Sequence, residues 1–179
     1  SRPSDPSRDW LCKWRADELF SALIPELLER GKVEAREIDD LIIGSAFGVS
    51  EQWSYGGRIP VFLAGLPETV PAKFIDQQCG SSMAAVQIGF MEIAMGFADV
   101  VVAGGMEHMT RVPMGPGLFE QGVISVNDSL YTHDDYRHWD METTMNMGFT
   151  AEKLFAQTSF TRRDLDLWGV RSHKMAAEA

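Results

Sequence analysis

Short apolar runs alternate with longer helical patterns along this chain of 179 residues. Mainly apolar runs at residues 41–47 and 99–103, and an extended stretch at residues 72–78, have the length and composition of strands. Short strands of this apolar kind are typical of a parallel sheet that is covered on both faces. The alternation of strands with helical segments predicts an α/β fold.

Residues 16–28 and 55–64 are the first two predicted helices. In residues 16–28 the apolar side chains recur with helical spacing, and Gly31 follows as a stop signal. Residues 55–64 are a weaker candidate, because glycines and a proline lie within them. We expect the first helix to cover the core with its apolar stripe.

A third predicted helix, residues 81–95, follows the 72–78 strand after a very short connection. It contains no proline, and Gln87 and Glu92 are its only polar residues from Met83 onward. A helix that is apolar nearly all round is typical of a position buried between layers. We therefore expect this helix to be buried.

Cys79 lies at the junction of that strand and that helix. We expect the unpaired N–H groups and the positive dipole of the first helical turn to favour its thiolate, which is a nucleophile. Gly80, Ser81 and Ser82 leave room for a substrate carbonyl to approach the sulfur. Buried structural cysteines are common, so the position alone leaves that alternative open.

Beyond the third predicted strand, residues 114–140 show no clear periodicity and predict a long excursion from the core. Two further helices are predicted at residues 142–156 and 162–179. Thr161 is a suitable N-cap for the second of them, with Asp164 three residues on.

Composition limits the partners of the chain. A formal net charge of −10 and a pI near 4.8 argue against nucleic acid or an anionic membrane as the main partner. Two cysteines give no disulfide framework, and no signal peptide or long apolar span is present. We therefore expect a cytoplasmic protein without membrane insertion.

We expect no metal site, because the spacing of the polar cluster in the excursion fits no common one. The cluster consists of His133, Asp134, Asp135 and His138.

Three segments resemble motifs of the thiolase family. Residues 78–85, Gln-Cys-Gly-Ser-Ser-Met-Ala-Ala, resemble the nucleophile motif. Residues 103–110 resemble the second motif, Ala-Gly-Gly-Met-Glu-His-Met-Thr, and residues 146–152 resemble a third that contains Met-Gly-x-Thr-Ala-Glu. The three segments occur in the family's order, and the resemblance spans essentially the whole chain.

The resemblance implies the first of two similar α/β halves in a layered fold. That half has a mixed, mainly parallel sheet and places the Cys79 helix in the central layer. Residues 1–113 would form the core that bears the nucleophile, and residues 114–179 would form the start of the loop domain and the following helices. The carboxyl-terminal half is absent from these residues and would join in cis or in trans.

The resemblance further implies an acyltransferase that forms or cleaves a 3-ketoacyl-CoA through an acyl-cysteine at Cys79. Acyl-CoA and coenzyme A would be substrates, no cofactor would be bound permanently, and fatty acid β-oxidation would be the metabolic setting. Met147 would face the acyl pocket, and Gly80 would belong to the substrate site. The family's base histidine and second cysteine lie in the carboxyl-terminal half, so we expect the isolated chain to be inactive.

The resemblance also implies a homodimer or homotetramer that pairs through the strand before Cys79. His108 stands in the second motif, and we expect it to be packed or hydrogen-bonded rather than to act as the base. Cys12 matches no motif and is interpreted as structural. Two alternatives stay open, a non-catalytic assembly partner that keeps the fold and a related decarboxylating ketosynthase.

Overall fold

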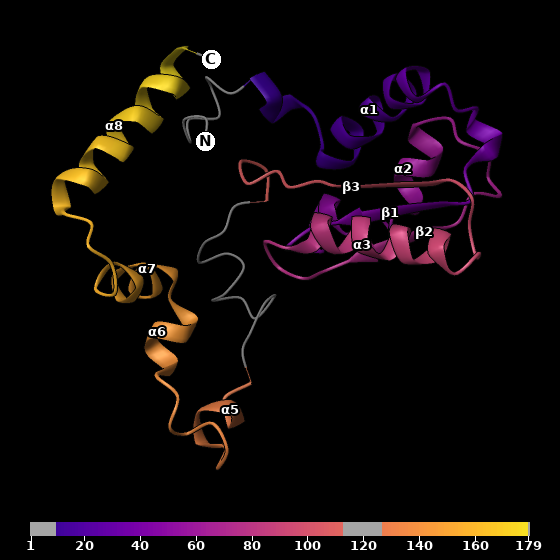
Figure 1. Cartoon of the computed structure of the whole chain (residues 1–179). Coiled ribbons are helices and arrows are strands. Elements are labelled where there is room, and N and C mark those ends of the chain that lie inside the picture. Colours follow the sequence, from indigo (N-terminus) through magenta and orange to yellow (C-terminus); the bar gives the residue numbers. More distant parts are fainter. Residues whose placement is uncertain (1–9, 113–126, 179) are drawn as a thin grey trace. The chain divides into compact units, whose positions relative to one another are not determined.

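The computed structural model describes residues 10–112 and 127–178 (Figure 1). These two stretches belong to two separate compact units. The domain boundary predicted between residues 113 and 114 lies outside the described residues.

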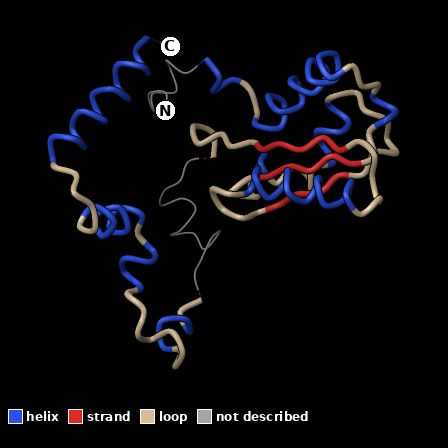
Figure 2. Tube along the Cα trace, in the orientation of Figure 1, coloured by secondary structure: helices blue, strands red, loops and turns tan. Residues whose placement is uncertain are grey.

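A parallel three-stranded sheet forms the centre of the first unit (Figure 2). Its strands are β1 (Asp40–Gly44), β2 (Ala72–Ile75) and β3 (Val101–Gly105), in the spatial order β2-β1-β3. All residues of the central strand β1 are buried, because it has a neighbour on each edge and a cover on each face. The predicted strands and the α/β fold class are therefore confirmed, although β1 and β2 are shorter than predicted and β3 begins and ends two residues later than its predicted run.

Helices cover both faces of this sheet (Figure 1). α1 (Ala16–Gly31) and α2 (Arg58–Leu63) pack on one face, and α3 (Ser81–Ala94) packs on the other. Single turns of 3₁₀ helix occur at η1 (Trp10–Lys13), η2 (Ala35–Glu37) and η3 (Ser50–Gln52). The unit thus has three layers, helix on sheet on helix.

The main hydrophobic core lies between β1 and the α1 and α2 layer. Leu41 and Ile43 point to this face and are fully buried, together with Ile24 of α1 and Val61 of α2. Ile42 points to the opposite face, toward α3, because successive side chains of a strand alternate. The fully apolar run that predicted β1 follows from this burial on both faces.

Residues before α2 explain why that helix is shorter than predicted. Ser54, Tyr55, Gly56 and Gly57 have positive φ values of 42°, 53°, 64° and 90°. A right-handed helix cannot include residues in this region of conformational space. The predicted helix at residues 55–64 is therefore confirmed only over its second part.

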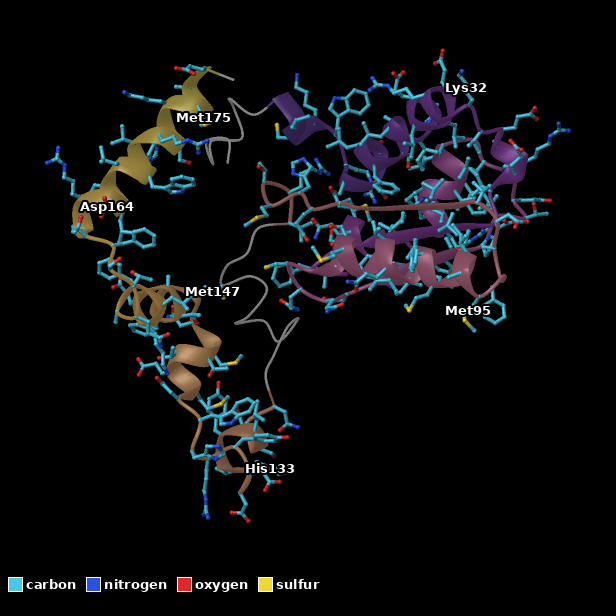
Figure 3. All side chains as sticks on the ribbon, viewed as in Figure 1. Lys32, Met95, His133, Met147, Asp164 and Met175 are labelled. Atoms are coloured by element: carbon cyan, nitrogen blue, oxygen red, sulfur yellow. The ribbon has the colours of Figure 1, made fainter. Side chains whose placement is uncertain are left out.

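The end of α1 agrees with the stop predicted at Gly31. The helix includes Gly31, and the next residue is Lys32, which is labelled in Figure 3. Lys32 turns into the left-handed region with a φ of 54°. The main-chain N–H of Lys32 donates to the carbonyl groups of Glu29 and Leu28, which otherwise would lack partners at the helix end.

α3 is buried on one face only, which corrects the expectation of a buried central helix. Its small residues Ala84, Ala85 and Gly89 face the sheet and are buried. The opposite face is apolar and exposed, with 71% of the surface of Phe90 accessible. The other large exposed side chains of α3 are Met83, Val86, Met91 and Ile93. The all-round apolar pattern that predicted burial requires a further layer, which the described residues do not contain.

Glycines allow the start of α3 to lie directly against the ends of β1 and β3. A Cβ atom at Gly44 would lie 2.5 Å from the carbonyl oxygen of Ser81 and from the nitrogen of Ser82. At Gly105, which is paired with Gly44 across the sheet, a Cβ atom would lie 2.7 Å from the Cβ of Ser82. Both contacts involve backbone atoms or a Cβ atom of α3, so a side chain could fit only if the helix moved.

The second unit is helical in its described residues. Its elements are α5 (Ser129–Thr132), α6 (Met141–Met145), α7 (Met147–Phe155) and α8 (Arg162–Glu178). α5 lies in the stretch predicted as an excursion, of which residues 114–126 are outside the described residues. None of the helices in the described parts of the chain is long and apolar enough to cross a membrane.

Asn146 divides the single helix predicted at residues 142–156 into α6 and α7. Its backbone is extended, with φ −123° and ψ 110°, and its side-chain oxygen accepts hydrogen bonds from the N–H groups of Gly148 and Phe149. Asn146 is therefore the N-cap of α7, a role that asparagine fills well. The prediction of one continuous helix was wrong at this residue.

The predicted start of α8 is confirmed. The carboxylate of Asp164 accepts hydrogen bonds from the N–H and the hydroxyl of Thr161, both at 2.7 Å. These two hydrogen bonds lower the pKa of Asp164 below its ordinary range. Such a reciprocal cap is a frequent signal at the amino end of a helix.

The contact at Gly44 can be tested with Gly44→Ala. We expect this variant to lose about 1–3 kcal/mol of unfolding free energy, because the added methyl displaces the backbone of α3. Gly31→Ala is the matched control, since its Cβ would have no neighbour nearer than 3.7 Å. Urea unfolding measures both, and equal midpoints for the two variants would contradict the close contact.

Candidate active site

The carboxyl ends of the three parallel strands meet at one edge of the sheet, where sites of α/β proteins commonly lie. Ser45 follows β1, and its main-chain N–H donates to the carbonyl of Ile75 at the end of β2. Glu107 follows β3 and binds the residues after β1. Cys79 follows β2, so the predicted nucleophile lies at this edge.

Cys79 occupies the turn between β2 and α3. β2 ends at Ile75, and α3 begins at Ser81 with Gly80 as the N-cap residue. Cys79 therefore precedes the N-cap, whereas the sequence placed it in the first helical turn. Its side chain is exposed to solvent, and Cys12 is half-buried by comparison.

Gln78, the residue before the nucleophile, has a left-handed backbone conformation with a φ of 50°. This conformation costs a residue other than glycine about 1–2 kcal/mol. The carboxylate of Asp76 accepts a hydrogen bond of 2.9 Å from the main-chain N–H of Gln78 and so supports the turn. Strained turns of this kind often present a nucleophile above a sheet edge.

Ser81 joins the two sides of the same turn. Its hydroxyl is buried, donates to the carbonyl of Gln78 at 2.5 Å and accepts from the N–H of Gln77 at 2.8 Å. The main-chain N–H groups of Gly80 and Ser81 donate in turn to the carbonyls of Gln77 and Gln78, at 3.0 and 3.1 Å. The backbone around Cys79 is therefore held by a dense local set of hydrogen bonds.

A polar network around the buried Gln52 and the exposed Glu107 joins the loops at this edge. The carboxylate of Glu107 accepts from the N–H of Ala46 at 2.8 Å and from the side-chain amide of Gln52 at 2.5 Å. The amide oxygen of Gln52 accepts from the main-chain N–H of His108 at 2.6 Å. Gln52 is fully buried, so it ties the loop after β1 to the segment after β3 without access to water.

Sequence reasoning did not assign a role to Gln52. The residues between β1 and α2 carry no periodic pattern, so nothing local marks this side chain as buried. Glu107 was identifiable only as part of the second motif, as an acidic residue directly after a strand. Its partners lie 61 and 55 residues earlier in the chain and become neighbours only through the parallel sheet.

His108 is packed and hydrogen-bonded, as expected, and that it does not act as the base stays a prediction. It is 7% exposed, and one ring nitrogen lies 3.1 Å from the carbonyl oxygen of Leu11. Arg111 adds to the same attachment of the N-terminal segment, since its guanidinium binds Glu51 and the carbonyl of Cys12. In the described residues, no hydrogen bond joins Cys79 to a histidine.

The chain matches a known protein family over nearly its whole length. The family model described as thiolase, N-terminal domain, matches residues 6–179. The chain belongs to the thiolase family.

Relatives named 3-ketoacyl-CoA thiolase are similar to this chain over most of its length. The protein of Marinomonas sp. (strain MWYL1) is 38% identical over 166 residues, which are 92% of this chain and 39% of the relative. A relative from Saccharophagus degradans is 37% identical over the same shares of the two chains. One from Acinetobacter baumannii is 36% identical over 90% of this chain and 38% of its own. The chain thus spans about two fifths of the length of these thiolases.

The two other predicted site residues, Gly80 and Met147, lie in different units of the chain. Gly80 lies beside Cys79, and a Cβ atom there would lie 3.3 Å from the carbonyl oxygen of Gln77, so glycine keeps the turn open. Met147 opens α7 in the other unit and is 76% exposed (Figure 3). A role in substrate binding stays a prediction for both residues, and so does the role of Cys79 as nucleophile.

The polar cluster at residues 133–138, for which no metal site is expected, makes local contacts. The ring of His133 packs against Tyr136, with ring centres 5.0 Å apart. Within residues 10–112 and 127–178, no group of histidine, cysteine and acidic side chains is arranged to hold a metal ion.

Replacement of Gln78 tests the strained turn. We expect Gln78→Val to be less stable than Gln78→Gly by about 1–2 kcal/mol, because a β-branched residue at positive φ is strained and glycine is not. Gln77 provides the control, since its φ is not positive. Glycine should be the less stable replacement there. Thermal unfolding of the four variants measures both differences, and the same order at both positions would contradict the left-handed turn.

Proposed function

We propose that this protein carries the nucleophile of a thiolase and that it forms or cleaves a 3-ketoacyl-CoA through an acyl-cysteine at Cys79. The observation that carries the proposal is the exposed thiol on a tight turn between strand and helix, within a sequence of the thiolase family. A thiol in this position can be reached by a thioester from outside the sheet edge.

The reaction consists of two acyl transfers. The sulfur of Cys79 attacks the thioester carbonyl carbon of an acyl-CoA, and the bond from that carbon to the coenzyme A sulfur breaks. The proton of Cys79 passes by way of a base to the departing coenzyme A thiolate, which leaves as the thiol. In condensation, a base removes an α proton from a second thioester, and the resulting carbanion takes the acyl group as the bond from its carbonyl carbon to the sulfur of Cys79 breaks. In cleavage, the sulfur of Cys79 instead attacks the 3-keto carbon of a 3-ketoacyl-CoA, and the bond between C2 and C3 breaks to release a carbanion that is protonated to acetyl-CoA. The thiol of coenzyme A then takes the acyl group from Cys79, and its proton returns to Cys79. A covalent intermediate divides one difficult transfer into two easier ones.

The oxyanion formed during each transfer needs hydrogen-bond donors. The N–H groups of Gly80 and Ser81 already donate to carbonyls of the turn. The N–H of Cys79 itself lies next to the attacking sulfur, and we propose it as the donor from this chain. Its value depends on its direction, since such donors act only when they point at the developing charge.

The base and the opposing donors are proposed to come from a second thiolase half, in cis or in trans. Two observations support this. The chain spans about two fifths of its relatives, and the exposed apolar face of α3 resembles a core surface rather than a solvent surface. Losing a general base costs about a hundredfold to ten-thousandfold in rate, so the 179-residue chain alone should show little or no turnover.

The remaining proposals concern substrates, assembly and setting. Acyl-CoA and coenzyme A are the proposed substrates, without a permanently bound cofactor, and the name 3-ketoacyl-CoA thiolase of the relatives supports this substrate class. Fatty acid β-oxidation is proposed as the metabolic setting. A homodimer or homotetramer is proposed through β2, which pairs only with β1 among the described strands. A cytoplasmic location is proposed from the cysteine usage.

Acylation of Cys79 is the test of this function. After incubation with acetyl-CoA, we expect mass spectrometry to find one acetyl group on the Cys79 peptide. Cys12→Ser should keep this modification, and Cys79→Ser should lose it, because Cys12 is half-buried and Cys79 is exposed. Acetylation of Cys12 in a folded protein whose Cys79 stays unmodified would refute the assignment and favour a non-catalytic assembly partner.

A further inference from the structure

The hydroxyl of Ser81 makes two contacts that no catalytic assignment uses. It donates to the carbonyl oxygen of Gln78 at 2.5 Å and accepts from the N–H of Gln77 at 2.8 Å. Ser81 is only 3% exposed, so water cannot replace this hydroxyl easily. Ser82, the next residue, has the same side chain but is exposed.

The carbonyl of Gln78 belongs to the peptide group that also contains the N–H of Cys79. A peptide group is planar, so the direction of its carbonyl determines the direction of its N–H. The carbonyl of Gln78 accepts from the hydroxyl of Ser81 at 2.5 Å and from the main-chain N–H of Ser81 at 3.1 Å. The hydroxyl makes the shorter of these two hydrogen bonds and therefore helps to set where the N–H of Cys79 points. No other residue within the described ranges makes a side-chain hydrogen bond to this peptide group.

The peptide group before Gln78 is held separately. Its N–H, on Gln78, donates to the carboxylate of Asp76 at 2.9 Å. Asp76 and Ser81 thus fix the two peptide groups on either side of the left-handed Gln78. A left-handed residue that is not glycine relaxes readily when such restraints are removed, because the relaxed conformation is about 1–2 kcal/mol lower.

We propose that Ser81 is a positioning residue for acyl transfer. Its hydroxyl orients the peptide group between Gln78 and Cys79 so that the N–H of Cys79 points at the oxyanion. The inference rests on the proposed acyl-cysteine function and adds to it a residue that acts through the backbone rather than on the substrate. Loss of the hydroxyl misdirects a donor for the transition state, so it lowers the rate of acyl transfer more than the binding of acyl-CoA.

Two reagents separate this role from a structural one. Attack of Cys79 on acetyl-CoA develops an oxyanion, whereas alkylation by iodoacetamide displaces iodide and develops none. In a Cys12→Ser background at about pH 9, where thiols are ionised without a general base, both second-order rates can be followed by mass spectrometry. The ratio of the acetylation rate to the alkylation rate reports the oxyanion donor.

For Ser81→Ala we expect the ratio to fall by about tenfold to a hundredfold, somewhat less than the removal of a complete oxyanion donor costs. The alkylation rate should stay within about threefold. Ser82→Ala, the matched control, should leave the ratio unchanged. Ser81→Thr keeps a hydroxyl and should restore most of the acetylation rate.

Several outcomes would overturn the proposal. These are an unchanged ratio in Ser81→Ala, an equal fall of both rates, or a ratio in Ser81→Thr as low as in Ser81→Ala. If Ser81→Ala does not fold, the ratio in Ser81→Thr decides alone. If the protein with native Ser81 is alkylated but never acetylated at Cys79, the proposed function itself is refuted. This outcome can be told apart from the others, because that protein is the reference for every ratio.

Discussion

The direct contact of the first turn of α3 with the ends of β1 and β3 is the constraint on which the candidate site depends. Gly44 and Gly105 are paired across the sheet, and neither leaves room for a side chain beneath Ser81 and Ser82. Because the helix begins against the sheet, the chain must turn sharply between Ile75 and Ser81. The strained conformation of the residue before Cys79 is a consequence of that short connection.

Hydrogen bonds then stabilise the turn that this packing requires. Asp76 and Ser81 hold the turn on its two sides. At the neighbouring strand ends, the exposed Glu107 and the buried Gln52 join the loops in a polar network whose shortest hydrogen bond is 2.5 Å. Removing one partner of such a network leaves a buried polar group without a hydrogen bond, which typically costs about 1–3 kcal/mol. The edge that carries Cys79 is therefore rigid on the side of the described sheet.

Local patterns predicted the parts of this structure that depend on neighbouring residues. The buried strand β1 followed from its apolar run and α8 from its cap at Thr161. The change of strand to helix predicted Cys79 at their junction, although it lies just before the N-cap and not in the first helical turn. Other features depend on contacts between distant residues. The burial of Gln52 and the left-handed Gln78 arise from the packing of α3 and the loops on the sheet. The one-sided burial of α3 could not be predicted either, since its composition suits a helix with a layer on both faces.

The central claim is that the folded protein itself presents the sulfur of Cys79 to an incoming reagent. It is tested most directly by the iodoacetamide rate of Cys79 at increasing urea concentrations below the unfolding transition, in a Cys12→Ser background and relative to glutathione. A thiol presented by the native turn should react at a rate that does not change with urea. A thiol that reacts only after local or global opening would react faster with each increment of urea, because the free energy of opening falls linearly with denaturant. A flat profile is the result that this structure predicts, and a steep rise would contradict it.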